Sequence, residues 1–191
     1  MTDSSDTLTV RSALRLVQDE LDGAADGLQD DQLAELVTEI QQARRVFVTG
    51  GGRSGLALSM HAMRLMHLGL SVHVVGETTT PAIGSGDLLI VASGSGTTAG
   101  AVAAAETSAD VGARVVVLTT DGGSKLAGLA HAVVVIPAAQ KTDHGGTASR
   151  QYSGSLFEQA LLLVLDATFH VLWQADGTPA EKLWPRHANL E

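Results

Sequence analysis

The sequence predicts a three-layer α/β/α sandwich around a five-stranded parallel sheet, preceded by N-terminal helices. Five short runs rich in Val, Ile and Leu recur along the chain, and they are continuously apolar, as strands buried on both faces are. Segments of helical character separate nearly all of these runs, which is the βαβ pattern that gives parallel strands and right-handed crossovers. The chain has 191 residues, of which 45% are hydrophobic, so it can form one domain with a substantial core.

The N-terminal segment, residues 1–44, is expected to be helical and to pack on a domain that spans residues 45–191. Apolar residues recur at helical spacing over most of this segment. The stretch 22–31 opens with Asp-Gly and closes with two aspartates, which predicts a break into two helices. Asp30 or Asp31 is the expected N-cap of the second helix.

From residue 45 onward, strands and helices are predicted to alternate. The predicted strands cover residues 45–49, 71–75, 87–92, 113–119 and 132–136. The predicted helices cover residues 54–68, 97–111, 124–130 and 155–174. Gly69 and Gly112 follow the first two of these helices, where C-terminal caps favour glycine. A polar, glycine-rich loop over 138–153 precedes the last helix.

The composition excludes several function classes. The formal charge is 12 − 21 = −9 and no basic run occurs, so neither nucleic acid nor an anionic membrane is an expected partner. The chain has no cysteine, which excludes disulfides, a thiolate nucleophile and zinc–cysteine sites. The histidines show no ligand spacing, so we expect no metal and no cofactor. The polar, acidic start is unlike a secretory signal, and the apolar stretch 156–173 carries charged residues, so we expect a cytoplasmic protein.

A first glycine-rich loop follows the first predicted strand. Its sequence is GGGRSG over residues 50–55, where Arg53 could supply local positive charge or form a surface ion pair, and Ser54 could contact a sugar or phosphate. The loop also matches the GxGxxG spacing of dinucleotide-binding proteins, and Glu77 follows the second strand at roughly the distance such a site requires. A dinucleotide site therefore stays an alternative.

A second loop, after the third predicted strand, alternates hydroxyl side chains with glycines. It comprises Ser93, Gly94, Ser95, Gly96, Thr97 and Thr98. Glycines let backbone N–H groups approach an anion, hydroxyls add donors, and the N-terminus of the following helix favours negative charge. Ordinary N-capping explains one hydroxyl but not four alternating with two glycines. The loop therefore predicts a site for a phosphate monoester.

The position of the two loops strengthens this interpretation. In a doubly wound sheet of order 2-1-3-4-5, strands one and three are neighbours at the point where the chain reverses direction across the sheet. Ligands bind at the carboxyl ends of the strands at this point. Both glycine-rich loops leave these two ends, so we expect them to line one cleft.

Ser93, Ser95 and Thr98 after a buried strand resemble the SIS (sugar isomerase) domain, a flavodoxin-like fold whose members bind phosphosugars. Within it, the chain is similar to the 6-phospho-3-hexuloisomerase family. The segments that carry this similarity are residues 52–55 (GRSG), 63–69 (MRLMHLG), 75–83 (VGETTTPAI), 155–158 (SLFE) and 186–191 (RHANLE). The resemblance implies conversion of D-arabino-3-hexulose 6-phosphate to fructose 6-phosphate in formaldehyde fixation by the ribulose monophosphate pathway. It also implies a homotetramer without a required metal.

Glu158 and His187 are the candidate catalytic residues. Glu158 lies near the start of an otherwise apolar helix, where it is either a partly shielded general base or a first-turn acid favoured by the helix dipole. The resemblance implies the first role. A histidine close to a C-terminus is usually a solvated surface residue. The resemblance instead implies that His187 opens the sugar ring or shuttles a proton, with the tail reaching the site of a neighbouring subunit.

The chain departs from the family at two points. Thr97 stands where family members often have Glu, so that carboxylate has no counterpart here. The loop over 140–154 is shorter than in some relatives. Two further alternatives stay open: a phosphosugar-sensing domain without catalysis, and an isomerase of another sugar phosphate. The predicted substrate-binding residues are Gly52, Arg53, Ser54 and the six residues from Ser93 to Thr98.

Overall fold

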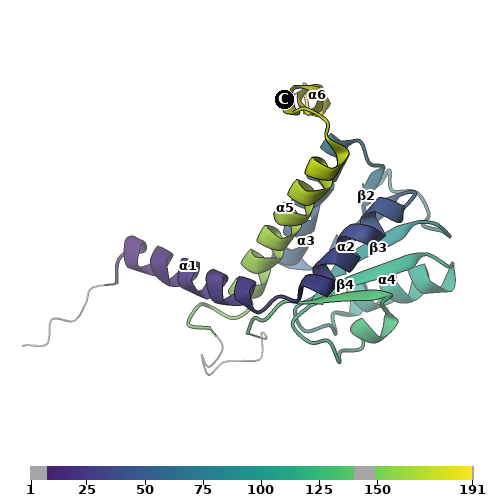
Figure 1. Cartoon of the computed structure of the whole chain (residues 1–191). Helices are drawn as coiled ribbons and strands as arrows, with labels where there is room; N and C mark the ends of the chain where they lie inside the picture. The colour runs from purple at the N-terminus through teal and green to yellow at the C-terminus, as the bar shows by residue number, and fades with distance from the viewer. Residues whose placement is uncertain (1–7, 140–148, 191) are drawn as a thin grey trace, which may run out of the picture.

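A five-stranded parallel sheet forms the centre of the protein, in a computed structural model that describes residues 8–139 and 149–190 (Figure 1). The strand order is β2-β1-β3-β4-β5, as predicted. Each strand lies within one residue of its predicted bounds: β1 (Val46–Gly50), β2 (Val72–Val74), β3 (Leu88–Ala92), β4 (Arg114–Thr119) and β5 (Ala132–Val135). All five residues of β3 are buried, which explains why its sequence is continuously apolar rather than alternating.

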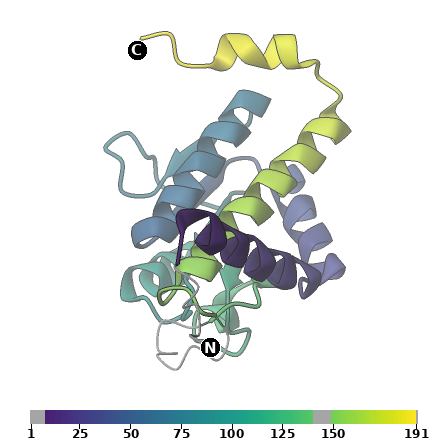
Figure 2. The same cartoon turned by 90° about the vertical axis from the view of Figure 1, so that its left-hand side faces the viewer.

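Helices cover both faces of the sheet and confirm the three-layer prediction. One face packs against α2 (Asp30–Gln42), α3 (Gly52–Leu68) and α5 (Ser155–Asp176). The other face packs against α4 (Ala99–Asp110) and the 3-10 turn η1 (Ala127–Leu129). Alternate residues of each strand enter these two cores. α3 and α5 lie side by side (Figure 2).

The N-terminal helix α1 (Val10–Asp26) projects away from the sandwich (Figure 1). Only Ala24 of its residues is buried. The predicted break between the two N-terminal helices covered too many residues. α1 continues through residues 22–26 of that stretch and ends at its C-cap, Gly27. The predicted N-cap was also wrong, since Gln29 holds that position in extended conformation. Asp30 and Asp31 instead fill the first turn of α2, where the helix dipole favours acidic side chains.

A further difference lies between β4 and β5. The helix predicted over 124–130 is reduced to η1, because seven residues containing a glycine give little cooperative helix stability. Most of the loop expected to be short, residues 140–148, lies outside the described residues. The chain ends in a short helix, α6 (Ala180–Leu183), followed by the turn η2 (Trp184–Arg186).

Among the described residues, α5 alone has the length and composition of a membrane-spanning helix, with a mean hydropathy of 1.4 over its most apolar window. That window is 44% buried inside the protein. Core side chains of α5 include Phe157, Leu161 and Leu165, which pack with those of α3 and the sheet. Packing inside the sandwich therefore accounts for the buried part of this helix, whereas Leu163 and Val171 are about half exposed.

The amino end of β3 is anchored by a buried carboxylate. The Asp87 side chain is fully enclosed and accepts hydrogen bonds from Arg45, from Arg44 Nε at 3.1 Å and from the Gly84 N–H at 2.9 Å. The hydrogen bond from Arg45, with those from Arg44 and Gly84, holds the pKa of Asp87 well below its usual value. This cluster lies at the edge of the sheet opposite the glycine-rich loops, so its role is structural.

We expect Asp87→Asn to lower the free energy of unfolding by about 2 kcal/mol near neutral pH, because the charged partner of both arginines is lost. A depressed folded-state pKa contributes stability above the unfolded value, near pH 4, and this stability is lost as the pH falls further. The difference between wild type and variant should therefore shrink below about pH 4. Urea unfolding at pH 7 and pH 3 measures it, with exposed Asp19→Asn as control. A difference independent of pH would contradict this account.

Candidate active site

The two glycine-rich loops lie next to each other at the carboxyl edge of the sheet. Gly50 at the end of β1 pairs with Ala92 at the end of β3, so the loops leave neighbouring positions. A Cβ on Gly51 of the first loop would lie 3.8 Å from the Thr98 methyl group of the second loop. The structure thus brings the two segments into one site, as the strand order predicted.

The first loop is shaped by close backbone approach. A Cβ on Gly55 would lie 2.3 Å from the carbonyl oxygen of Gly50, so a side chain there would force the turn open. Gly52 has a φ of +56°, in the left-handed region that favours glycine. The strand-to-helix turn itself therefore accounts for the GxGxxG spacing, without a dinucleotide. Ser54, in the first turn of α3, is buried.

The second loop is held by hydrogen bonds among its own hydroxyls. Ser93 Oγ lies 2.8 Å from Thr98 Oγ1, and Thr97 Oγ1 donates to Ser95 Oγ at 3.0 Å. Thr98 is the N-cap of α4, yet its side chain makes no capping hydrogen bond. Capping therefore does not explain these hydroxyls. Thr97 is exposed and its hydroxyl is turned toward Ser95.

The start of α5 brings a carboxylate to both loops. Phe157 lies under Gly94, where an added Cβ would be 3.3 Å from its ring. The next residue, Glu158, pairs through Oε2 with Arg53 Nε at 2.9 Å. Its side chain is 9% exposed and that of Arg53 is 61% exposed, so the ion pair lies at the mouth of the site with the carboxylate inside.

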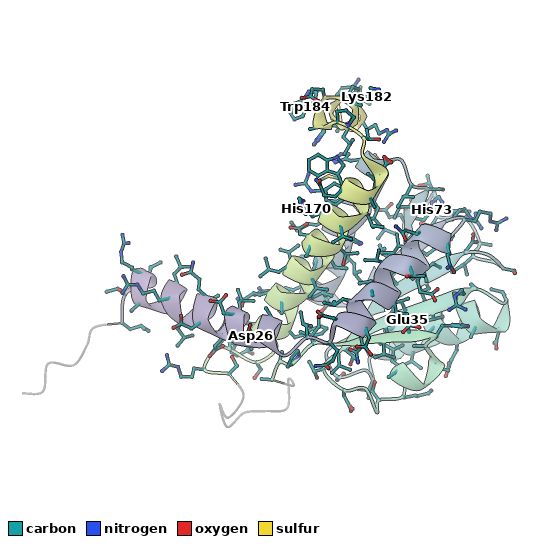
Figure 3. The ribbon with its side chains drawn as sticks, in the orientation of Figure 1. Asp26, Glu35, His73, His170, Lys182 and Trp184 are labelled. Carbon is teal, nitrogen blue, oxygen red and sulfur yellow. The ribbon has the colours of Figure 1, made fainter. Side chains whose placement is uncertain are left out.

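His187 does not join this site within one chain. Its ring lies 3.9 Å from the ring of His67 and 4.7 Å from that of Trp184, measured between centroids. Arg186 fixes the tail by donating from Nη1 to the His67 carbonyl at 2.7 Å, at the C-terminal end of α3. His67 is fourteen residues beyond Arg53 on the same helix, which corresponds to about 21 Å. Figure 3 shows Trp184 beyond the C-terminal end of α5, while Glu158 belongs to its first turn.

Two histidines of α3, His61 and His67, are buried. Burial lowers the pKa of His61 to about 4. Burial also lowers the pKa of His67, with smaller contributions from His187 and Arg64. Both residues are therefore neutral near pH 7. No group of three His, Cys, Asp or Glu side chains that could hold a metal ion occurs in the part of the chain that the structure describes.

Sequence reasoning missed two features of this region. The Arg53–Glu158 ion pair joins residues from two helices that are far apart in sequence. The Arg186–His67 contact seats the tail on α3. The segments 63–69 and 186–191 each carry part of the family resemblance, but the sequence does not indicate that they are in contact. The fold shows this contact, in the hydrogen bond from Arg186 to the His67 carbonyl.

Comparison with known proteins identifies the family. The SIS domain matches residues 39–163. The 3-hexulose-6-phosphate isomerase of Mycobacterium gastri is 59% identical over 95% of this chain and 92% of its own length. The chain belongs to this family of SIS-domain proteins. The 3-hexulose-6-phosphate isomerase of Bacillus subtilis is 36% identical over 92% of this chain and 95% of its own length.

Solved structures of SIS-type proteins agree with the fold. A Methanococcus jannaschii protein, for which a molecular function of 3-hexulose-6-phosphate isomerase was inferred, superposes with a TM-score of 0.82 and 27% identity. The match covers 94% of this chain and 99% of that protein. The structural similarity therefore extends over nearly all of this chain.

Proposed function

We propose that the protein isomerises D-arabino-3-hexulose 6-phosphate to fructose 6-phosphate, in formaldehyde fixation by the ribulose monophosphate pathway. The observation that carries this proposal is the position of Glu158. It is an enclosed carboxylate set beside two anion-binding loops, in a chain 59% identical to a 3-hexulose-6-phosphate isomerase. A sugar phosphate held by the loops would present its carbon chain to this carboxylate.

The phosphate group would bind the second loop. The hydroxyls and N–H groups of the six residues from Ser93 to Thr98, with the N-terminus of α4, supply donors without a formal charge. Gly52, Arg53 and Ser54 would contribute the second wall of the site, and Arg53 adds one positive charge. These groups allow a chain of net charge −9 to bind an anionic substrate.

The reaction moves a carbonyl from C3 to C2 by proton transfers. Glu158 would remove the proton from C2, and the electron pair of that bond would form a C2–C3 double bond as the C3 carbonyl oxygen gains a proton. This gives the 2,3-enediol. Protonation at C3 and loss of the C2 hydroxyl proton would then yield the C2 ketone. His187 would open the cyclic sugar or carry protons between the oxygens.

Assembly, domain organisation and location belong to the same proposal. We infer a cytoplasmic homotetramer with sites near subunit interfaces, since the candidate base and histidine lie apart within one chain. An apolar groove of about 280 Å³ between α1, α2 and α5 also supports assembly. Leu36 and Ile40 lie in the same core as the sheet, which supports packing of residues 1–44 on the domain over 45–191.

A coupled assay tests the function. The purified chain is mixed with enzymatically generated D-arabino-3-hexulose 6-phosphate, and fructose 6-phosphate is followed by its conversion to glucose 6-phosphate and NADPH formation. Turnover is expected. Turnover only of a pentose or heptose phosphate would assign a different substrate. Thermal stabilisation by fructose 6-phosphate without turnover would assign a sensor.

A further inference from the structure

A carboxylate on α1 holds the segment that leads into α5. Glu20 Oε2 accepts a hydrogen bond from Ser149 Oγ at 2.6 Å and another from Gln151 Nε2 at 3.0 Å. Glu20 Oε1 accepts from the Arg150 N–H at 2.8 Å. α1 lies against α5, which brings the carboxylate within reach of this segment (Figure 2). One side chain of α1 therefore binds three consecutive residues from a distant part of the chain, and we call these hydrogen bonds the Glu20 tether.

Burial and charge make the Glu20 tether stronger than an ordinary surface hydrogen bond. Glu20 is partly buried, and Ser149 is 9% exposed. Burial raises the pKa of the Glu20 carboxyl, but the hydrogen bonds from residues 149–151 outweigh it and hold the pKa below its usual value. Glu20 is therefore ionised near neutral pH, and hydrogen bonds to an ionised acceptor are stronger than those between neutral groups.

The contacts continue from this segment into the first turn of α5. Gln159 Nε2 donates to Gln151 Oε1 at 3.0 Å, so Gln151 is bonded to α1 through its amide nitrogen and to α5 through its amide oxygen. Gly154, the N-cap of α5, has a φ of +84°, and its carbonyl accepts from the Glu158 N–H at 3.2 Å. The hydrogen bonds therefore run from Glu20 to the residue next to Glu158.

We propose that Glu20 is a positioning residue for the isomerase reaction, because it fixes the start of α5 and with it the direction in which Glu158 presents its carboxylate. A general base must lie within hydrogen-bond reach of the proton it removes, and a shift of about 1 Å can reduce the rate about 100-fold. Arg53, which pairs with Glu158, is 61% exposed, and an exposed ion pair fixes a side chain only weakly. The backbone of α5 must therefore supply much of the constraint. The role in catalysis rests on the proposed function of Glu158, whereas the tether itself does not.

A purely structural role for Glu20 would give a different experimental result. Ala24 is the one buried residue of α1, so this helix adds little to the core. Loss of the tether should then lower the melting temperature slightly and leave turnover unchanged at a temperature where the variant is fully folded. A positioning role instead requires a lower kcat under those conditions.

Steady-state kinetics distinguishes the two roles. Glu20→Ala removes both acceptor oxygens of the tether, and kcat is expected to fall about 10- to 100-fold in the coupled assay. KM should change little, because the proposed phosphate site on the second loop is untouched. Asp19→Ala removes the neighbouring, exposed carboxylate of the same helix and should leave both constants unchanged. Unchanged kcat in Glu20→Ala, with or without a lower melting temperature, would overturn the proposal.

An exchange of donor and acceptor tests whether the contact itself matters. Glu20→Gln keeps one acceptor oxygen and should lose less activity than Glu20→Ala. Combined with Gln151→Glu, it places a donor at position 20 and a carboxylate at position 151, to which Gln159 Nε2 can still donate. The double variant should exceed both single variants in kcat. Without such recovery the two positions would not act through their shared contact, and the proposal would fail.

Hydrogen exchange measures the tether without reference to activity. In Glu20→Ala the Arg150 N–H loses its acceptor, so exchange of a peptide covering residues 149–154 should become about tenfold faster, while a peptide from α4 keeps its rate. Equal exchange in wild type and variant would overturn the tether. Faster exchange in a chain that turns over no hexulose phosphate would remove the isomerase and leave the tether. An active chain whose kcat does not respond to Glu20→Ala would keep the function and lose the positioning role.

Discussion

The Glu158→Gln variant is expected to lose isomerase activity by about 10²- to 10⁴-fold in kcat, the contribution typical of a positioned general base. Gln preserves the size of the side chain and can still contact Arg53, but it cannot accept the proton from C2. KM should change little, because the proposal assigns binding of the substrate's phosphate to the second loop and not to Glu158. Steady-state kinetics in the coupled assay separates kcat from KM.

Two controls distinguish catalysis from charge. Glu106→Gln removes a carboxylate from an exposed pair with Lys125 on the other side of the molecule and should leave kcat unchanged. Arg53→Met removes the partner of Glu158 but leaves the base in place, so its loss should appear mainly in KM. Equal losses of kcat in the Arg53 and Glu158 variants would show that the ion pair, and not the base, is what catalysis needs.

The sheet could be predicted from sequence because a strand that is buried on both faces has apolar residues at consecutive positions. The strand over 88–92 is apolar at each position and buried at each position. The alternation with helices predicted parallel strands, and the order 2-1-3-4-5 of a doubly wound sheet placed the two glycine-rich loops at neighbouring positions, as the structure has them. Local sequence was sufficient there because each strand and each loop is encoded within a few residues.

The relations between distant segments could not be predicted in this way. Glu158 meets Arg53 only because α3 and α5 run side by side and in the same direction, which depends on how both helices pack on the sheet. The position of His187 depends on the three-residue turn η2 and on Arg186. A segment this short shows no periodic pattern of apolar residues from which its packing could be predicted. The N-cap of α2 was misplaced for a related reason, since two neighbouring aspartates compete as candidates and only the backbone of Gln29 decides.

Within the second glycine-rich loop, the proposed phosphate site, Gly96 is the position at which an added methyl group should be most disruptive. Its φ is +60°, and an added Cβ would lie 2.0 Å from Ser124 Oγ and 2.3 Å from Ser124 Cβ. The Gly96 carbonyl accepts from Leu126 N at 3.0 Å, so the loop cannot move away without losing its anchor to the segment before η1. We expect Gly96→Ala to weaken binding of fructose 6-phosphate about tenfold or more, equivalent to at least about 1.4 kcal/mol.

Isothermal titration with fructose 6-phosphate measures this loss, and two variants assign its cause. Gly76→Ala introduces a side chain at a φ of +98° with open space around it, so it reports the backbone strain without a collision. Ser124→Gly in the Gly96→Ala background removes the colliding atoms and should recover a large part of the affinity. Unchanged affinity in Gly96→Ala would mean that the phosphate does not use this loop, and the site would then have to be sought around Arg53 and Ser54 alone. Recovery in the double variant would instead tie phosphate binding to the loop geometry that the alternating glycines and hydroxyls allow.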